Sequence, residues 1–207
     1  MADWFLWFVA LTGGYLLGSV PVGYLVVRWF RGIDIRQVGS GRIGGTNVLR
    51  AAGWKVALLS GLLDGVKGLF AVLIARWLGG PPLRWALAGV MAVVGHNYPL
   101  FLSFRGGAGT STSIGGAVGL WPWNLPILAT VLFGFALGSR HASLGSIAVA
   151  VVLPTIFIVR AALGLDPWAF VLYGVLTSAV TLWALRPNID RLRRGQERYI
   201  DFKASMS

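Results

Sequence analysis

The sequence contains no cysteine. Disulfides, thiolate metal sites and cysteine nucleophiles are therefore excluded. Charged residues are also scarce, at 12% of 207 residues, whereas 56% are hydrophobic and the mean hydropathy is +0.72. A soluble domain of this size needs far more charge on its surface. The composition thus indicates a polytopic membrane protein, which we expect to form a single domain over residues 1–207.

The few charged residues are mostly positive: 18 Lys and Arg stand against 7 Asp and Glu, for a net charge of +11. In a soluble protein this balance would suggest a nucleic-acid partner. Here the basic residues cluster in short segments beside apolar runs, as membrane orientation requires, so we expect no nucleic acid. The N-terminus lacks a basic segment and its apolar run exceeds a signal-peptide core, so we expect no cleaved signal.

Long apolar runs predict an all-α, polytopic helical bundle with about seven transmembrane helices. The runs cover about residues 4–27, 56–75, 85–99, 114–121, 125–139, 143–159 and 168–185. The run 114–121 is too short to cross a bilayer unless the preceding Thr/Ser residues are also helical. Fourteen of the eighteen Lys and Arg fall on one side, three on the other, and Lys67 within a span. The positive-inside rule therefore predicts an outside N-terminus and a cytoplasmic C-terminus.

A polar stretch follows the first span and combines glycines with basic and hydroxyl side chains. It runs from Gly39 to Arg50 and contains four glycines together with Ser40, Arg42, Thr46 and Asn47. Glycine lets backbone N–H groups approach an anion closely, and guanidinium groups bind phosphate oxygens in bidentate fashion. The stretch predicts an anion-binding loop, with phosphate as the expected anion. The alternative is a flexible loop whose arginines only mark the cytoplasmic side.

The same stretch contains a G-x-G-x-x-G match at Gly39, Gly41 and Gly44. That fingerprint indicates a dinucleotide site only when a strand precedes it and a helix follows within a βαβ unit. A membrane-length apolar run precedes it here, and no alternating strand pattern follows. We therefore do not expect nucleotide binding.

A second glycine- and hydroxyl-rich stretch follows the third span, as Gly95-His-Asn-Tyr-Pro99 and Phe104-Arg-Gly-Gly-Ala-Gly-Thr-Ser-Thr-Ser113. The span count puts it on the same side as the first, and two such loops on one membrane face indicate a site. His96 alone would more often be structural than catalytic. Within the second span, Asp64 and Lys67 share a helix face and can pair. Such a pair either locks helices together or faces a polar cavity.

Further motifs are Leu63-Asp-Gly-Val-Lys67, Ser143-Leu-Gly-Ser146, and Asn188 followed by Gly195-Gln-Glu197. With the two loops, in this order and spacing, they make the chain resemble the PlsY family over nearly its whole length. These are bacterial integral-membrane acyl-phosphate:glycerol-3-phosphate acyltransferases. The resemblance implies acyl transfer from a fatty acyl phosphate to the 1-hydroxyl of glycerol 3-phosphate, giving lysophosphatidic acid. It also implies a place in the bacterial inner membrane, among membrane lipids, with the active site facing the cytoplasm.

The residue chemistry agrees with such a reaction. An acyl phosphate is an activated mixed anhydride, so a Ser-His-Asp nucleophile is not required. The site must supply two phosphate pockets, an orientation and space for the acyl chain. No metal-ligand cluster is visible, and the resemblance implies neither a metal nor coenzyme A.

The resemblance also implies roles for particular residues. We expect Ser40, Arg50 and Asn188 to be catalytic. The expected substrate-binding residues are Gly41, Arg42, Thr46, Asn47, His96, Arg105, Gly106, Gly107 and Ser143. Of these, the first loop would hold glycerol 3-phosphate, whereas the second loop and the Ser143 region would hold the acyl phosphate.

The chain departs from the family pattern at several positions. Ala108 stands where the family has a lysine, Leu185 where it has a histidine, Pro187 where it has an acidic residue, and Arg42 where it has an asparagine. One alternative is therefore a divergent member that binds without turnover or uses another acceptor. Another is a transporter or channel for anionic substrates, which short helices and an intramembrane ion pair would also suit. Such transporters often contain internal repeats, and none is visible.

Overall fold

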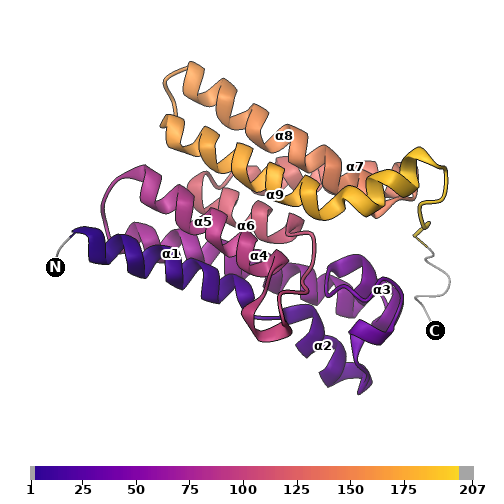
Figure 1. Ribbon diagram of the computed structural model, residues 1–207. Coiled ribbons are helices and arrows are strands. Elements are labelled where there is room, and N and C mark those ends of the chain that lie inside the picture. The colour runs from indigo at the N-terminus through magenta and orange to yellow at the C-terminus, as the bar shows by residue number, and fades with distance from the viewer. Residues whose placement is uncertain (1–2, 201–207) are drawn as a thin grey trace.

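The computed structural model describes residues 3–200, which form helices joined by turns and contain no β-strand (Figure 1). The all-α prediction is thus confirmed. The elements are α1 (Asp3–Ser19), α2 (Val22–Arg31), η1 (Ile35–Gln37), α3 (Gly45–Ala52), α4 (Trp54–Trp77), α5 (Pro82–Asn97), η2 (Leu100–Leu102), α6 (Thr110–Leu120), α7 (Asn124–Ser139), α8 (Ala142–Ala162) and α9 (Trp168–Arg193).

Five helical segments are long and apolar enough to cross a membrane: Asp3–Arg31, Trp54–Trp77, Pro82–Leu102, Ala142–Ala162 and Trp168–Arg193. The α6 and α7 helices are shorter, with 11 and 16 residues. As the sequence requires, α6 begins within the Thr/Ser run, yet at 1.5 Å per residue it is only about 16 Å long. It packs against α4, α5 and α7, and nearly all of its residues are buried. A short helix is tolerated there because protein, not lipid, surrounds its ends.

The apolar run predicts one continuous helix for the first span. The structure instead has a break between α1 and α2. Pro21 lacks an N–H and cannot continue the hydrogen-bond pattern of an α-helix. Just before it, Val20 N donates to Leu17 O, three residues back, at an N···O distance of 3.2 Å, which closes a tighter turn than that of an α-helix. Before the break, α1 lies very close to α5. A Cβ added at Gly14 or Gly18 would collide with carbonyl oxygens of α5, so glycine is what permits this approach.

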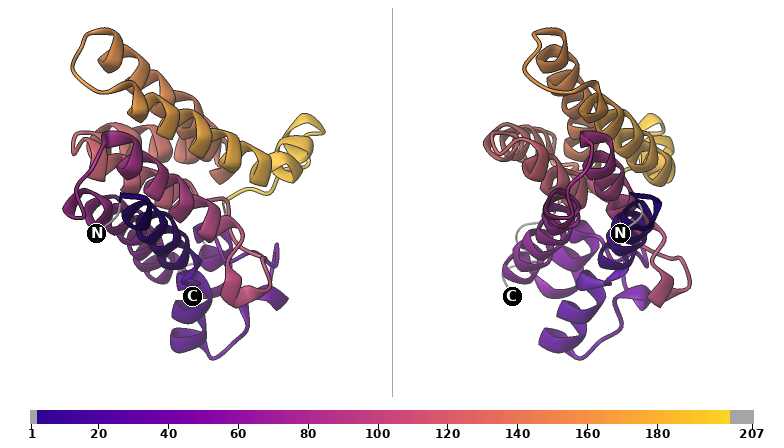
Figure 2. Two further views of the ribbon diagram at one scale, coloured as in Figure 1. Left: turned by 60° about the vertical axis from the view of Figure 1, so that its left-hand side comes forward. Right: turned by 90° about the vertical axis from the view of Figure 1, so that its left-hand side faces the viewer.

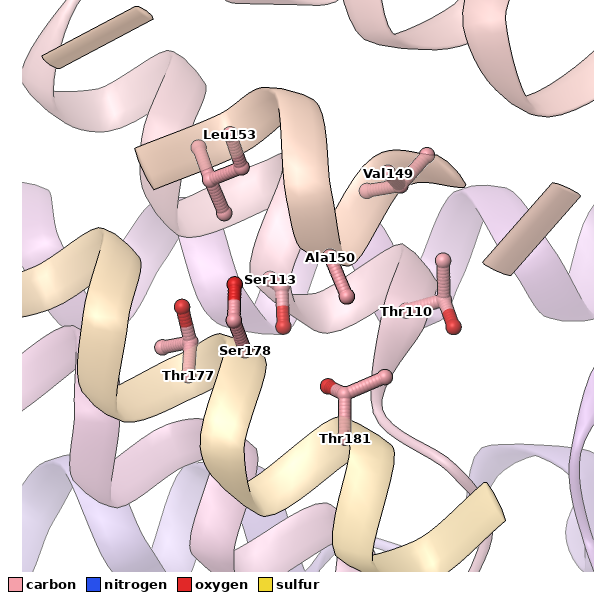
Figure 3. Close-up of a pocket in the computed structure, with 8 residues that line it drawn as sticks. All are labelled: Thr110, Ser113, Val149, Ala150, Leu153, Thr177, Ser178 and Thr181. Atoms are coloured by element: carbon pink, nitrogen blue, oxygen red, sulfur yellow. The ribbon is translucent and has the colours of Figure 1, made fainter. Parts of the chain in front are cut away.

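The helices α8 and α9 run antiparallel, side by side, and form a layer above α5 and α6 (Figures 1 and 2). The main apolar core lies between them and includes Phe157, Phe170 and Tyr173. The buried Tyr173 hydroxyl donates to Ser113 O at 2.6 Å, which satisfies its polar tip inside the bundle. Next to it runs a narrow crevice between α6, α8 and α9, with hydroxyls on two sides and α8 methyl groups on the third (Figure 3).

The two ends of the bundle differ in how their arginines are held. At the end that carries the α4–α5 and α8–α9 turns, Arg84 pairs with Asp3, Arg160 with Asp166, and Arg76 donates to Gly119 O. Exposed tryptophans surround both ends: Trp4, Trp77 and Trp168 at this one, and Trp29, Trp54 and Trp183 at the other. Such belts are typical of an integral membrane protein.

Candidate active site

The first glycine-rich loop is folded around the side chain of Asn47. This buried amide donates to Ile35 O, Val38 O and Arg42 O at 2.8–3.2 Å, and its oxygen accepts from Ser40 N at 3.0 Å. A Cβ at Gly39 would collide with the same amide oxygen. Asn47 therefore shapes the loop from inside, which explains its presence without contact to a substrate.

The loop leaves its other predicted site residues accessible. Ser40 is exposed, and Gly41 takes a left-handed conformation (φ +69°) that favours glycine. Thr46 lies half-buried in the first turn of α3, and Arg50 is exposed in its last turn. Arg42 is half-buried, and burial lowers its pKa, to which the nearby Arg191 and Arg186 contribute.

The second loop is folded back onto the end of α5. Gly106 N donates to Asn97 O at 3.1 Å, and Gly107 N donates to His96 O at 3.2 Å. These bonds satisfy carbonyls that a helix C-terminus leaves without partners. The N–H groups of both predicted binding glycines are thus engaged within the protein. Arg105, just before them, projects an exposed side chain.

The two loops meet, as the sequence predicts. A Cβ added at Gly44 would stand 3.8 Å from Gly107 Cα and 3.9 Å from Ala108 N. Both loops lie at the same end of the bundle, opposite the end where Arg84 and Arg160 are paired (Figure 1). The contact is between backbones, so a change of loop position on one side is transmitted to the other.

His96, predicted to bind substrate, is buried beneath the second loop. Its Nδ1 lies 3.2 Å from Asp64 Oδ1, and its Nε2 faces Gly107 so closely that a Cβ there would collide with it. Contact with a substrate stays a prediction for this residue. The geometry favours a supporting role, because both ring nitrogens face protein groups.

The C-terminal segment adds a third part, centred on Glu197. Its Oε1 accepts from Asn188 Nδ2 at 2.8 Å and from Ser143 Oγ at 3.1 Å, while its Oε2 accepts from Arg191 Nε at 2.8 Å. Burial alone would raise the pKa of Glu197, but the hydrogen bonds from Asn188, Arg191 and Ser143 outweigh it and hold the pKa below its ordinary value. The carboxylate thus joins α9 to the start of α8.

Residues beyond Glu197 extend this contact. Ile200 N donates to Arg140 O at 2.8 Å, and the rings of Tyr199 and His141 stack at 4.6 Å. Partial burial lowers the pKa of Arg50 in α3, and the charge of Arg198 in this segment lowers it further, whereas Glu197 acts in the opposite direction. The first loop, α9 and the C-terminal segment therefore gather several guanidiniums around one carboxylate. An excess of guanidinium groups at a partly buried site favours an anion such as phosphate.

Sequence reasoning assigned no role to Glu197 or Arg191. Glu197 belongs to the motif Gly195-Gln-Glu197, but the sequence does not indicate which side chains its carboxylate contacts. The departure at Leu185 lies buried in α9, and α9 continues through Pro187 to Arg193, well beyond the predicted span end. No group of three or more His, Asp or Glu that could hold a metal ion occurs within residues 3–200.

The fold is that of an integral membrane protein, with a cluster of arginines at one end of a helical bundle. Residues 8–195 match the family described as glycerol-3-phosphate acyltransferase. The chain is 44% identical over 193 residues to a glycerol-3-phosphate acyltransferase of Syntrophomonas wolfei, covering 92% of this chain and 95% of that one. It is 46% identical over 188 residues to one of Rubrobacter xylanophilus, covering 89% and 90%.

Solved structures give the same result. The chain resembles the crystal structure of PlsY (YgiH), an integral membrane glycerol 3-phosphate acyltransferase, in its glycerol 3-phosphate form. The TM-score is 0.85 at 31% identity, with 97% of this chain and 98% of that one covered. A lysophosphatidic acid form of PlsY gives a TM-score of 0.84 at 30% identity, with the same coverage. The chain belongs to the glycerol-3-phosphate acyltransferase family.

Proposed function

We propose that this protein transfers a fatty acyl group from an acyl phosphate to the 1-hydroxyl of glycerol 3-phosphate, giving lysophosphatidic acid for phospholipid synthesis. The observation that carries the proposal is the meeting of two glycine-rich loops beside the Glu197 cluster, where Arg42 and Arg50 lie with α9 arginines. The PlsY structures were determined with glycerol 3-phosphate and with lysophosphatidic acid, which are the acceptor and the product of this reaction.

In this reaction the 1-hydroxyl oxygen forms an ester C–O bond at the acyl carbon, and the bond from that carbon to the phosphate oxygen breaks. The phosphate leaves and takes up the proton that the hydroxyl loses. The phosphate is already a good leaving group, so the protein needs to orient the two substrates and stabilise their charge. Arg50 and Arg42 would bind the glycerol 3-phosphate together with Ser40, Gly41 and Thr46, on a loop that Asn47 shapes. The bidentate fork of a guanidinium suits that anion.

The acyl phosphate would lie against the second loop and the start of α8. Arg105 supplies the exposed cation there, and the close approach of Gly106 and Gly107 to α5 sets where that cation stands. Asn188 and Ser143 both donate to Glu197, so they would act from the rim of the site.

The proposed topology has seven crossings in the bacterial inner membrane, with α6 and α7 completing the five long segments. The N-terminus lies outside, and both loops and the C-terminus lie in the cytoplasm. The distribution of charge supports this orientation, because Arg76, Arg84 and Arg160 are all engaged at one end. The other end carries the excess of basic residues.

Complementation of a bacterial strain that lacks its own acyltransferase of this family tests the function. We expect growth with the parent sequence and none with Arg50→Ala produced at the same membrane level. A purified protein should release phosphate from acyl phosphate only when glycerol 3-phosphate is present. Failure of both assays with protein correctly inserted in the membrane would contradict the proposal and favour the divergent, non-catalytic member.

A further inference from the structure

An ionic cluster, formed by Asp64, Lys67 and His96, lies buried between α1, α4 and α5, behind the two loops. Asp64 Oδ1 is 2.9 Å from Lys67 Nζ and 3.2 Å from His96 Nδ1. All three side chains are almost fully buried. Intramembrane ionisable groups are costly and are usually retained for a function, so their partners indicate what this cluster does.

Lys67 is bonded to the break between α1 and α2. Its ammonium donates to Gly18 O at 2.8 Å and to Val20 O at 3.0 Å. In an unbroken helix Gly18 O would accept from Val22 N, but that N–H donates to Val20 O instead. The lysine therefore satisfies a carbonyl that the break leaves without a backbone partner. A cation at a helix C-terminus is also favoured by the helix dipole.

The break determines where the first loop lies. Beyond it, α2 packs directly against that loop, since a Cβ at Gly23 would collide with Ile43 O. Any shift of α2 relative to α4 would therefore carry Ile43 and the loop with it. Lys67, by holding the break against α4, fixes the starting point of this unit.

The other arm of the cluster reaches the second loop through His96. The imidazole is held between Asp64 on one side and Gly107 on the other. The main chain of His96 also accepts from Gly107 N at 3.2 Å. The Asp64 carboxylate thus contacts both Lys67, which holds the helix break before the first loop, and His96, which lies under the second loop. The loops in turn meet at Gly44 and Gly107.

We propose that Asp64, Lys67 and His96 are positioning residues that set the separation of the two loops, and through it the fit of the site to its substrates. The proposal rests on the proposed function only for its kinetic consequence. A cluster that merely holds helices together is the competing explanation. The two differ in what changes when both charges are replaced together. A positioning cluster changes the loop separation and the binding of substrate, whereas a cluster that only holds helices together changes stability alone.

The test uses the double variant Asp64→Leu/Lys67→Met, with Arg160→Met/Asp166→Leu as a matched control. The control removes a half-buried ion pair, with 2.6 Å between Arg160 Nε and Asp166 Oδ2, from the opposite end of the bundle. Because the chain has no cysteine, Gln37→Cys and Ser103→Cys allow spin labels on the exposed surface of each loop segment. Pulsed electron–electron double resonance then measures the distance between the two spin labels, independently of enzyme activity.

We expect the cluster variant to fold with a lower melting midpoint than the parent, because Gly18 O and Val20 O lose their donor, and to show a broadened loop-to-loop distance distribution. The KM for glycerol 3-phosphate should rise about tenfold or more, because small displacements of positioning groups are costly. The control should match the parent in both readouts. A parent-like distance distribution or a parent-like KM in the cluster variant would overturn the proposal.

If the double variant does not fold, His96→Phe takes its place. Phenylalanine keeps ring bulk against Gly107 but removes the contact with Asp64, and the charge pair remains. The same two readouts apply, with the same expected and contradicting results. If the parent protein shows no transferase activity, the proposed function fails, and the distance measurement alone decides whether the cluster sets the loop separation.

Discussion

Asn188 Nδ2 donates to Glu197 Oε1 at 2.8 Å, which couples a residue predicted to be catalytic to the C-terminal segment. Without that carboxylate, Asn188 and Ser143 would lose a shared acceptor and the segment would lose its docking point. A hydrogen bond to a charged group contributes about 1.5–3 kcal/mol. The C-terminal segment is therefore anchored to two residues of the candidate site and is not a free tail.

The first prediction is that Glu197→Ala lowers acyl transfer about tenfold or more and increases the mobility of a spin label at Gln196→Cys. Asp190→Ala is the matched control, because Asp190 is an exposed carboxylate near the end of α9, seven residues before Glu197. Equal activity in the Glu197 and Asp190 variants would show that docking of the segment does not affect the site.

A second prediction concerns pH. Because the pKa of Glu197 lies below its ordinary value of 4.5, its docking contacts are fully present above that pH. They should be lost as pH falls through the lowered folded-state pKa, since protonation removes the charge that Arg191 pairs with. The label at Gln196→Cys should then become mobile on the acid side. Glu197→Gln should lack this transition, and the same acid profile in both proteins would refute the assignment.

Hydrophobic run length predicts α4, α5 and α8 well, because a bilayer selects for long apolar segments. It does not predict the break at Pro21, since Val20 and Val22 on either side are as apolar as the rest of the span. Nor does it predict that α9 continues past Pro187, where polar residues extend the helix beyond the apolar run.

The composition of the two loops predicts that they form one site, and the structure brings them together. The role of Asn47 is different, because its partners are main-chain carbonyls whose positions depend on the folded loop. The contact between Asp64 and His96 likewise joins two helices, and the two residues are 32 positions apart in the sequence. No sequence periodicity indicates such a contact. Residue type and spacing identify candidates, whereas cross-helix partners need the tertiary fold.

A third prediction is topological: both loops and the C-terminal segment face the cytoplasm. Single cysteines at Gln37, Ser103 and Gln196 should stay unlabelled by an impermeant thiol reagent added to intact cells. A cysteine at Leu163, which is exposed between α8 and α9, should be labelled under the same conditions. The reverse pattern of labelling would invert the proposed orientation.

A fourth prediction tests Arg50 as a substrate ligand. Arg50→Lys should cut activity sharply although the charge is kept, because a bidentate fork becomes a point charge. Loss of a charge-assisted hydrogen bond of about 1.5–3 kcal/mol corresponds to about a ten- to over a hundredfold loss in rate or affinity. Arg36→Lys is the control, since Arg36 is paired with Asp34 at 2.7 Å and has no predicted role in the site. Similar turnover in the two variants would assign Arg50 to membrane orientation instead.

The last prediction concerns the cation that the second loop lacks at Ala108. We hypothesise that Arg42 supplies this positive charge from the first loop. Gly44, two residues after Arg42, lies close to Ala108: a Cβ added at Gly44 would stand 3.9 Å from Ala108 N. Arg42 is half-buried beside other arginines, and such a position favours a bound anion. A guanidinium also reaches further than an ammonium, so it can serve a phosphate from the facing loop.

A two-site cycle of Arg42→Asn and Ala108→Lys tests this idea. Arg42→Asn alone should nearly abolish phosphate release from acyl phosphate, and Ala108→Lys alone should change it little, because a second cation is redundant. Adding Ala108→Lys to Arg42→Asn should restore a good part of the activity, since the positive charge at the phosphate returns. The two effects are then strongly non-additive, as expected for groups that act on one ligand. Additive effects would exclude compensation. An Arg42→Asn protein as active as the parent would exclude it as well and would leave Arg42 without a role in the site.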